Sequence, residues 1–316
     1  MKLSLASAVI AVLLAPLPSI HAAQTSFQAP LVDQSLLLDI TQSGDQLVAV
    51  GERGHIIRST DGQNWQQVEV PSTSTLTGVY FIGQQGWAVG HDFVILHTQN
   101  NGLNWDVQHF APEQERPLLD VVFFNENHGI AIGAYGAFLR TQDGGKTWQS
   151  ELHAEFVNQY DQDYLNEIRL EDEAFYKEEL AAILPHLNSI SVSGENVYIA
   201  GEAGLLATST DKGQTWKRMD IDYQGSFFNI EQAKSGQLIA TGLRGNVFVF
   251  DKEAQQWSAI DAGSKASMNA VVSVDASRTV LLGNNGAIVT MQGDDVNLSQ
   301  CRLTALNICS KHGNRP

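Results

Sequence analysis

The sequence predicts an all-β propeller of six four-stranded repeats and an incomplete seventh, with a helical insert between repeats 3 and 4. Three observations predict this fold: a recurring turn sequence that ends in tryptophan, a glycine turn upstream of each copy, and a spacing of roughly forty residues between most copies. A four-stranded unit of this length cannot bury both faces of its sheet alone. Successive units must therefore pack face to face around an axis.

The recurring turn has the form Ser/Thr-x-Asp-x-Gly-x-Thr-Trp, and each residue type has a structural task. The Asp side chain accepts hydrogen bonds from backbone N–H groups of its own turn, while the glycine adopts a positive φ. The tryptophan fills the space between neighbouring sheets. We therefore interpret the following residues as structural: Asp61, Trp65, Asn100, Trp105, Asp143, Trp148, Asp211, Trp216, Asp251 and Trp257. A catalytic pair of acids would instead be unique to one site.

The other strands of each unit are predicted from apolar runs upstream of the tryptophan turn. A Gly-x-x-Gly turn joins two of them at residues 51–54, 133–136, 201–204, 242–245 and 283–286, with a variant that begins at Gly90. A further apolar run opens each unit, at residues 36–40, 76–82, 118–124, 187–192, 227–230 and 268–274. With the strands on either side of the tryptophan turn, each unit contains four short strands.

Residues 152–186 interrupt the repeat and predict one or two amphipathic helices. This insert is rich in Asp and Glu, and Arg169 and Lys177 are its only Arg or Lys residues. Two interpretations stay open, a solvated acidic face of the fold and an element that contacts a partner. The insert is counted as part of a single propeller domain that spans residues 27–308.

The first 22 residues have the pattern of a secretory signal peptide, with Lys2 ahead of an apolar run and small residues at the expected cleavage point. The mature chain is therefore expected in the periplasm or outside the cell, without direct membrane insertion. Residues 302–308 resemble the innermost strand of a seventh unit, and residues 27–30 resemble the outermost strand of a blade. Residues 309–316 form a tail. Cys301 and Cys309 either form one disulfide or remain free thiols.

The chain is strongly acidic, with 35 Asp and Glu residues against 19 Lys and Arg residues, which gives a formal net charge of −16 at pH 7. Such a chain repels phosphate backbones, so nucleic-acid binding is not expected. The sequence contains no Gly-x-Ser-x-Gly elbow, phosphate-binding loop or Cys/His zinc pattern. We expect neither a cofactor nor a metal.

The turns between the second and third strands carry side chains that differ from one repeat to the next. In a propeller these turns share one face with the connections between blades, and the helical insert projects from that face. Variable polar residues gathered on a rigid scaffold are typical of a binding surface. The candidate partner-binding residues are Arg53, His55, His91, Asp92, Tyr135, Glu202, Arg244 and Asn284.

The tryptophan turns resemble those of the BNR/Asp-box proteins. Their order, together with the sequences Leu37-Leu-Asp-Ile, Val50-Gly-Glu-Arg-Gly-His55, Trp87-Ala-Val-Gly-His91 and Gly225-Ser-Phe-Phe228, resembles the Ycf48/Hcf136-like family. The resemblance implies a seven-bladed propeller that acts as an assembly or stability factor of photosystem II by binding protein. That family includes secreted relatives in non-photosynthetic bacteria, and nothing in this sequence itself indicates photosynthesis.

A catalytic alternative stays open because sialidases share the Asp-box. A glycosidase needs two positioned carboxylates, and Glu52, Asp92 and Glu202 all belong to the candidate face. Sialidases also hold the substrate carboxylate with an arginine cluster, whereas only Arg53 and Arg244 occupy turns of this face. The favoured function is a non-catalytic periplasmic scaffold or assembly factor for a membrane-associated complex. The alternatives are an Asp-box glycoside hydrolase and a glycan-binding protein.

Overall fold

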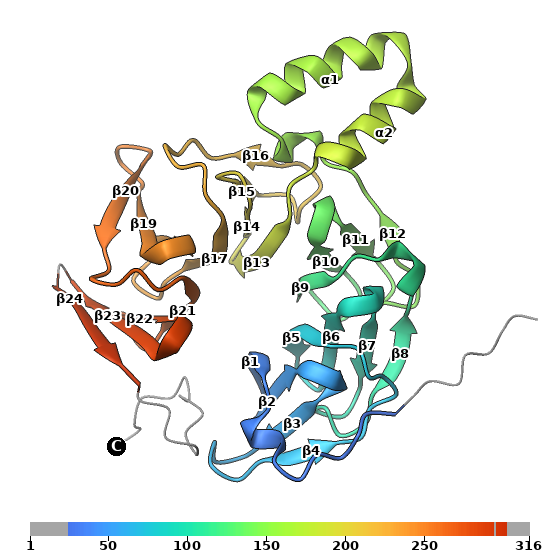
Figure 1. Ribbon diagram of the computed structural model, residues 1–316, viewed down its shortest axis with the longest axis vertical. Coiled ribbons are helices and arrows are strands. Elements are labelled where there is room, and N and C mark those ends of the chain that lie inside the picture. The colour runs from blue at the N-terminus through green and yellow to red at the C-terminus, as the bar shows by residue number, and fades with distance from the viewer. Residues whose placement is uncertain (1–24, 294, 302–316) are drawn as a thin grey trace, which may run out of the picture.

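Six four-stranded antiparallel sheets stand radially around one axis in the computed structural model, which describes residues 25–293 and 295–301 (Figure 1). Neighbouring strands within every sheet follow one another in sequence, so each sheet is a meander built from one repeat. The predicted all-β propeller is confirmed. We number the sheets as blades one to six in chain order.

Blades one to three precede the helical insert. Blade one contains β1 (Leu37–Ser43), β2 (Gln46–Gly51), β3 (Ile56–Ser59) and β4 (Gln66–Val68). Blade two contains β5 (Leu76–Ile82), β6 (Gln85–Gly90), β7 (Ile95–Thr98) and β8 (Asp106–His109). Blade three contains β9 (Leu118–Phe123), β10 (Gly129–Gly133), β11 (Phe138–Thr141) and β12 (Gln149–Ser150).

Blades four to six follow the insert. Blade four contains β13 (Leu187–Ser193), β14 (Asn196–Gly201), β15 (Leu206–Ser209) and β16 (Lys217–Arg218). Blade five contains β17 (Phe227–Gln232), β18 (Leu238–Gly242), β19 (Asn246–Asp251) and β20 (Gln256–Asp261). Blade six contains β21 (Met268–Ser273), β22 (Arg278–Gly283), β23 (Ala287–Gln292) and β24 (Asp295–Gln300).

The first strand of every blade lies nearest the axis, and these inner strands contact one another in the order β1, β5, β9, β13, β17 and β21 (Figure 1). Each inner strand has a register shift next to its second residue, as between Leu37 and Asp39 in β1 and between Phe227 and Asn229 in β17. Such a bulge re-aims the neighbouring side chain. The residues around the bulges therefore line the centre of the ring.

The core lies between the blades, because the sheets of blades one to five bury apolar side chains on both faces. In blade one, Val48 and Ile56 pack toward blade two, whereas Ala49 and Ile57 lie in a cluster on the opposite face. Trp105 is buried in the cluster between blades one and two. Face-to-face packing of successive sheets is thus what stabilises the ring, as the repeat length requires.

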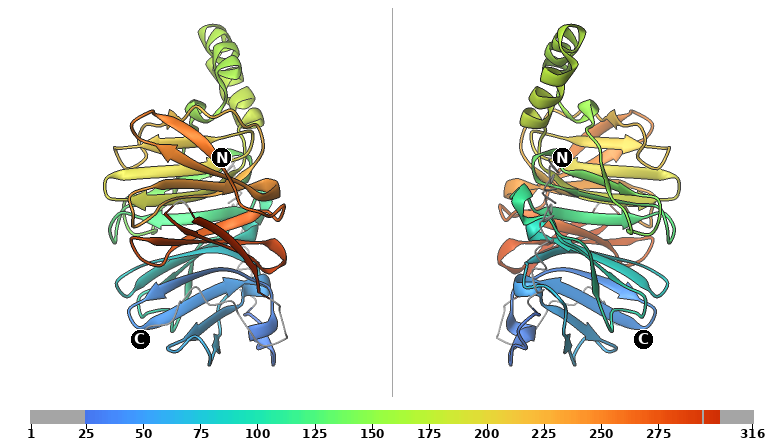
Figure 2. Two further views of the ribbon diagram at one scale, coloured as in Figure 1. Left: turned by 90° about the vertical axis from the view of Figure 1, so that its left-hand side faces the viewer. Right: turned by 90° about the vertical axis from the view of Figure 1, so that its right-hand side faces the viewer.

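The insert forms a short turn, η6 (Ala154–Phe156), followed by α1 (Gln159–Glu171) and α2 (Glu173–Ile183). The Asn158 side chain caps α1 by accepting from Asp161 N, and the Asp172 side chain caps α2 by accepting from two backbone N–H groups. The hairpin stands out from the rim of the propeller (Figure 2). Neither helix has the length and apolar character that a membrane crossing requires, nor does any other helix in the described ranges.

The root of the insert belongs to the propeller core. Phe156, Leu180 and Leu184 lie in the same buried cluster as side chains of blades three and four. Helix α2 also packs against η5 (Ala134–Gly136), the turn between β10 and β11. The predicted amphipathic helices are confirmed, and their apolar side completes the contact between two blades.

Several predictions about the chain ends fall outside the described residues: the signal peptide at 1–22, the partial seventh unit at 302–308, the tail at 309–316 and the pairing of Cys301 with Cys309. Residues 27–30 are described and do not form a strand. Instead, Ala29 N donates to the Gln67 side chain and the Gln67 amide donates to the Phe27 carbonyl, which holds this segment beside β4 of blade one. Side-chain contacts thus replace the expected ladder here.

One face of blade six lacks a neighbouring sheet within residues 25–293 and 295–301. Val271, Leu281 and Val289 are buried against blade five. Side chains of the other face, such as Val280 and Ile288, remain half-buried. Apolar surface on that side is available to a further sheet, as the predicted seventh unit requires.

Candidate partner-binding face and central channel

The turns between the second and third strands have one shared backbone geometry. Five are η2 (Glu52–Gly54), η3 (His91–Phe93), η5, η7 (Leu243–Gly245) and η8 (Asn284–Gly286), and the sixth is 202–204. In all six the first residue donates its backbone N–H to the carbonyl group just before the inner strand, at 2.9–3.0 Å. The backbone is therefore fixed, and the side chains of the turn are left to vary.

The middle residue of each turn adopts a left-handed backbone conformation although it is not glycine. These residues are Arg53, Asp92, Tyr135, Ala203, Arg244 and Asn285, with φ between 52° and 59°. For residues other than Gly, Asn and Asp this conformation costs about 1–2 kcal/mol. All six side chains are exposed. At Arg53, Tyr135, Ala203 and Arg244 the blades thus hold an unfavourable backbone conformation at exposed positions.

The structure places the sequence-predicted residues at two positions of these turns. Arg53, Asp92, Tyr135 and Arg244 take the left-handed middle position. His91, Glu202 and Asn284 take the first position, where His91 and Asn284 are exposed and Glu202 is half-buried. All seven share the face that bears the connections between blades, which we call the turn face. Whether this face binds a partner stays a prediction.

His55 differs from the other candidates because its imidazole is 2% exposed and lies beneath the turn face. Neither ring nitrogen has a hydrogen-bond partner among the described residues. Burial is the largest influence on the pKa of His55 and lowers it. The charge of Glu52 raises this pKa by a smaller amount, and the charge of Arg53 lowers it by a smaller amount. Burial thus favours the neutral imidazole and keeps His55 out of the exposed surface of the turn face.

Two candidates from neighbouring blades are linked through a residue that the sequence did not single out. The His186 ring packs edge-on against the Tyr135 ring, with ring centroids 4.5 Å apart. His186 Nδ1 also lies 3.6 Å from Glu202 Oε1. His186 is the last residue of the insert, directly before β13, so the exit of the hairpin joins the turns of blades three and four.

The three carboxylates that a glycosidase would need are held by their own blades. Asp92 Oδ2 accepts a hydrogen bond from Ser74 Oγ at 2.6 Å. Glu52 Oε1 accepts from Leu36 N at 3.3 Å, and Glu202 contacts His186. They belong to blades one, two and four and are not paired with each other. In the ranges that the structure describes, no three His, Cys, Asp or Glu residues form a group that could hold a metal ion.

The Asp-box acids use their oxygens within their own turns, on the face opposite the turn face. Asp143 Oδ1 accepts from Thr147 N and from Thr141 Oγ1, and Asp143 Oδ2 accepts from Thr147 Oγ1, all at 2.7–2.9 Å. These hydrogen bonds, those from Thr147 first, lower the pKa of Asp143 to about 2. Asp211 makes the same set of bonds with Ser209 and Thr215. A turn-forming role accounts for these carboxylates.

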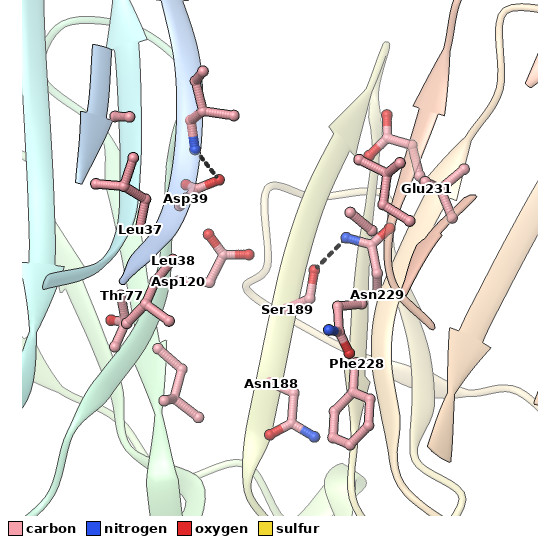
Figure 3. Close-up of a pocket in the computed structure, with 17 residues that line it drawn as sticks. Leu37, Leu38, Asp39, Thr77, Asp120, Asn188, Ser189, Phe228, Asn229 and Glu231 are labelled. Carbon is pink, nitrogen blue, oxygen red and sulfur yellow. Dashed lines mark hydrogen bonds between the residues drawn. The ribbon is translucent and has the colours of Figure 1, made fainter. Parts of the chain in front are cut away.

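The centre of the ring contains a cavity of about 470 Å³ lined by the inner strands (Figure 3). Asp39 and Asp120 lie on its wall at the same position of β1 and β9. Asp39 Oδ2 accepts from Val79 N in the next blade, and Asp120 Oδ2 accepts from Ile190 N in the next blade, each at 2.9 Å. Each carboxylate thus connects two neighbouring blades at the axis.

Burial, and next the charge of Asp39, raise the pKa of Asp120 to about 7, although hydrogen bonds from Ile190, Val121 and Ser189 oppose the shift. Asp39 and Asp120 were not among the residues predicted from the sequence. Their signal is the repeated Leu-Leu-Asp at the start of two inner strands, Leu37-Leu-Asp39 and Leu118-Leu-Asp120. Both acids already accept backbone hydrogen bonds, which favours a structural role for the pair.

Comparison with known proteins places this geometry in a family. A photosystem II assembly protein Ycf48 from Synechococcus sp. (strain JA-2-3B'a(2-13)) is 28% identical over 197 residues, covering 61% of this chain and 52% of that protein. The chain therefore spans about half the length of this relative. A solved structure of YCF48 bound to D1 peptide matches with a TM-score of 0.63 at 20% identity, covering 88% of this chain and 84% of that one.

A GH74 xyloglucanase from Xanthomonas campestris matches with a TM-score of 0.56 at 12% identity, covering 80% of this chain and 44% of that one. At such identities both solved structures show the propeller fold alone. The model of the family described as photosynthesis system II assembly factor YCF48 matches residues 21–114 and 108–224. Because these matches together cover more than half of the 316 residues, the chain belongs to the Ycf48 family.

Proposed function

We propose that the protein is a non-catalytic scaffold or assembly factor that holds another protein on its turn face. The observation that carries this proposal is the ring of six left-handed turns, which keeps one backbone geometry and presents exposed side chains of five different types. A rigid backbone with variable side chains suits recognition of one specific surface, because little conformational entropy is lost on binding.

The names of the relatives support a protein partner. The curated relative is called a photosystem II assembly protein, and one solved Ycf48 structure carries a D1 peptide. For this chain we propose an extended segment of a membrane-associated protein that is exposed to the periplasm. The predicted signal peptide supports that compartment.

The geometry of the carboxylates favours binding over catalysis. Glu52, Asp92 and Glu202 each bond to a residue of their own blade and are not paired across a shared pocket. A glycosidase needs two carboxyl groups about 5–10 Å apart on either side of a sugar. The named relatives are assembly factors, which also favours a non-enzymatic role.

The experiment is capture of crosslinked partners by the affinity-labelled chain expressed in its native host. Arg53→Ala with Arg244→Ala removes two cations from the turn face. Lys252→Ala with Arg278→Ala removes two cations from the opposite end of the blades and serves as the matched control. The exposed positions should leave folding unchanged.

We expect to capture the same partner with the wild-type chain and with the control variant. The turn-face variant should capture at least about tenfold less of it, because the loss of two contacts worth about 1 kcal/mol each weakens the binding constant by the product of two factors. Equal recovery from both variants would contradict the use of this face. Hydrolysis of aryl glycosides by the purified protein would instead favour the glycosidase alternative.

A further inference from the structure

The outer side of helix α1 combines exposed apolar side chains with carboxylates. Residues 160, 164, 167 and 171 recur at intervals of three and four, so they share one face of the helix, with 163 and 170 beside them. Tyr160 is 82% exposed and Leu170 is 89% exposed. Side chains this apolar are rarely left so accessible in a group, and such a group is typical of an interaction site.

This outer side contributes nothing to the packing of the propeller. Leu165, on the opposite side of α1, is buried in the core between blades three and four, and Ile168 packs against that core. Helix α2 contacts the turn η5, whereas α1 packs chiefly against α2. The hairpin stands clear of the rim, so the outer side of α1 is open to a macromolecule (Figure 2).

The charge of this surface is negative and is not compensated within the hairpin. Arg169 and Lys177 both pair with Glu173, at 3.2 and 3.6 Å. They are the only Arg and Lys residues of the insert. Tyr160 and Leu170 share this side with Asp163, Glu167 and Glu171, and none of these three acids forms an ion pair in the described part of the chain. Tyr164 lies on the same side and donates its hydroxyl to Glu179 of α2.

We propose that the outer side of α1 docks a basic, amphipathic segment of the partner protein, in which Lys or Arg side chains alternate with apolar ones. This inference rests on the proposed function, because it presupposes that the chain holds another protein. Tyr160 and Leu170 lie about 15 Å apart along the helix and provide two apolar anchors. The surrounding carboxylates attract the basic residues and select against acidic surfaces, including anionic membranes and nucleic acids.

The test uses a defined probe, a fluorescein-labelled helical peptide of about 18 residues with Lys on one face and Leu on the other. Its binding to the full mature chain is followed by fluorescence anisotropy at low and high NaCl. Two comparison peptides replace every Lys by Glu or every Leu by Gln. We expect the Lys/Leu peptide to bind in a salt-dependent manner and both comparison peptides to bind at least about tenfold more weakly, because each lacks one of the two attractions.

Two variants of the surface separate its contributions. Tyr160→Ser with Leu170→Ser should raise the dissociation constant at least about tenfold, because both anchors are lost. Asp163→Asn with Glu167→Gln and Glu171→Gln should remove most of the salt dependence. The matched control is Leu103→Ser with Asp106→Asn, which removes an exposed apolar residue and an exposed acid from blade two. Circular dichroism verifies that the helices remain.

If the basic peptide is attracted to the acidic protein without specificity, the control variant should weaken its binding as much as the α1 variants do. This outcome would overturn the proposal. Unchanged binding to both α1 variants would overturn it as well. If sedimentation shows that the chain associates with itself through Tyr160 and Leu170, the occupant is a second copy and the proposal is wrong. Partner capture that still depends on Arg53 and Arg244 would leave the proposed function standing in each case.

Discussion

Arg140 and Glu151 form a two-pronged ion pair inside the propeller, with Arg140 Nε 2.6 Å from Glu151 Oε1 and Nη2 2.8 Å from Glu151 Oε2. The same guanidinium donates to the carbonyl groups of Lys212 and Gly213 in the Asp-box turn of blade four. One side chain of β11 thus joins blade three, the entrance of the insert and the next blade. Burial raises the pKa of Glu151, but hydrogen bonds from His153 and Arg140 lower it more, to about 2.

Replacing Arg140 is expected to cost much more stability than replacing an exposed arginine. Arg140→Leu leaves Glu151 without its counter-charge and two carbonyl groups without donors, so the free energy of unfolding should fall by about 3–5 kcal/mol. Arg169→Ala, in an exposed pair with Glu173, should change it by less than about 1 kcal/mol. Urea unfolding followed by tryptophan fluorescence measures both. Similar losses from the two variants would show that the buried ion pair contributes no more to the free energy of unfolding than the exposed one.

The channel acid Asp120 predicts a loss of stability as the pH rises. Its pKa is about 7 in the folded chain, against about 3.9 in an unfolded one. Between these values the folded state binds more protons, so its free energy of unfolding falls from about pH 4 to pH 7. Asp120→Asn cannot ionise and should lack this fall. The free energy of unfolding of the variant, minus that of wild type, should therefore increase from pH 5 to pH 8.

Urea unfolding at pH 5, 6, 7 and 8 tests this prediction, and Asp39→Asn provides a related variant. Removing the Asp39 charge should lower the pKa of Asp120 and shift the fall in stability to lower pH. Tyr80 stays neutral over this range, because burial first, and then the charges of Glu231 and Asp120, raise its pKa. Parallel pH profiles for wild type and Asp120→Asn would refute the assignment.

The strained turns predict a separation of stability from binding. Asn285 occupies the left-handed position in blade six, where asparagine is better tolerated than arginine. Arg53→Asn should therefore leave the free energy of unfolding unchanged or raise it by about 1 kcal/mol, while partner capture decreases. Thermal unfolding and the capture experiment measure the two effects. A clear loss of stability would indicate that Arg53 serves the fold and not the partner.

The chain leaves blade six at Cys301 in the same way as it leaves other blades. In three blades the carbonyl group of a connecting residue, Ser72, Tyr223 or Ser264, packs on the glycine of the turn, and the next inner strand begins four residues later. The Cys301 carbonyl packs on the corresponding glycine of blade six.

The sequence predicts residues 302–308 as the innermost strand of a seventh unit, and this segment lies outside the described residues. If that prediction is right, Ile308→Asp should lower the free energy of unfolding by about 3 kcal/mol, because it introduces a charge into the apolar run of that strand. Asn314→Asp introduces the same charge further along the tail and should change stability by less than about 0.5 kcal/mol. Urea unfolding distinguishes them. Equal, small effects would contradict a structural role for residues 302–308.

Local sequence was sufficient for the repeat, the tryptophan turns and the two helices. Spacing and turn chemistry act within a few residues, as in the bonds that Asp211 accepts from Thr215 in its own turn. Those features were predicted with the correct blade assignment. The position of Arg53, Asp92, Tyr135 and Arg244 in exposed turns also followed from the repeat.

Only the tertiary structure decided which distant residues meet. The ring brings Asp39 and Asp120 to one channel and carries Arg140 to the turn of the next blade, although long stretches of sequence separate them. It also buries His55 beneath the turn whose middle residue is exposed. The physical reason is that a repeat fixes the fold of one blade, whereas the electrostatic environment of a side chain depends on the blades that pack against it.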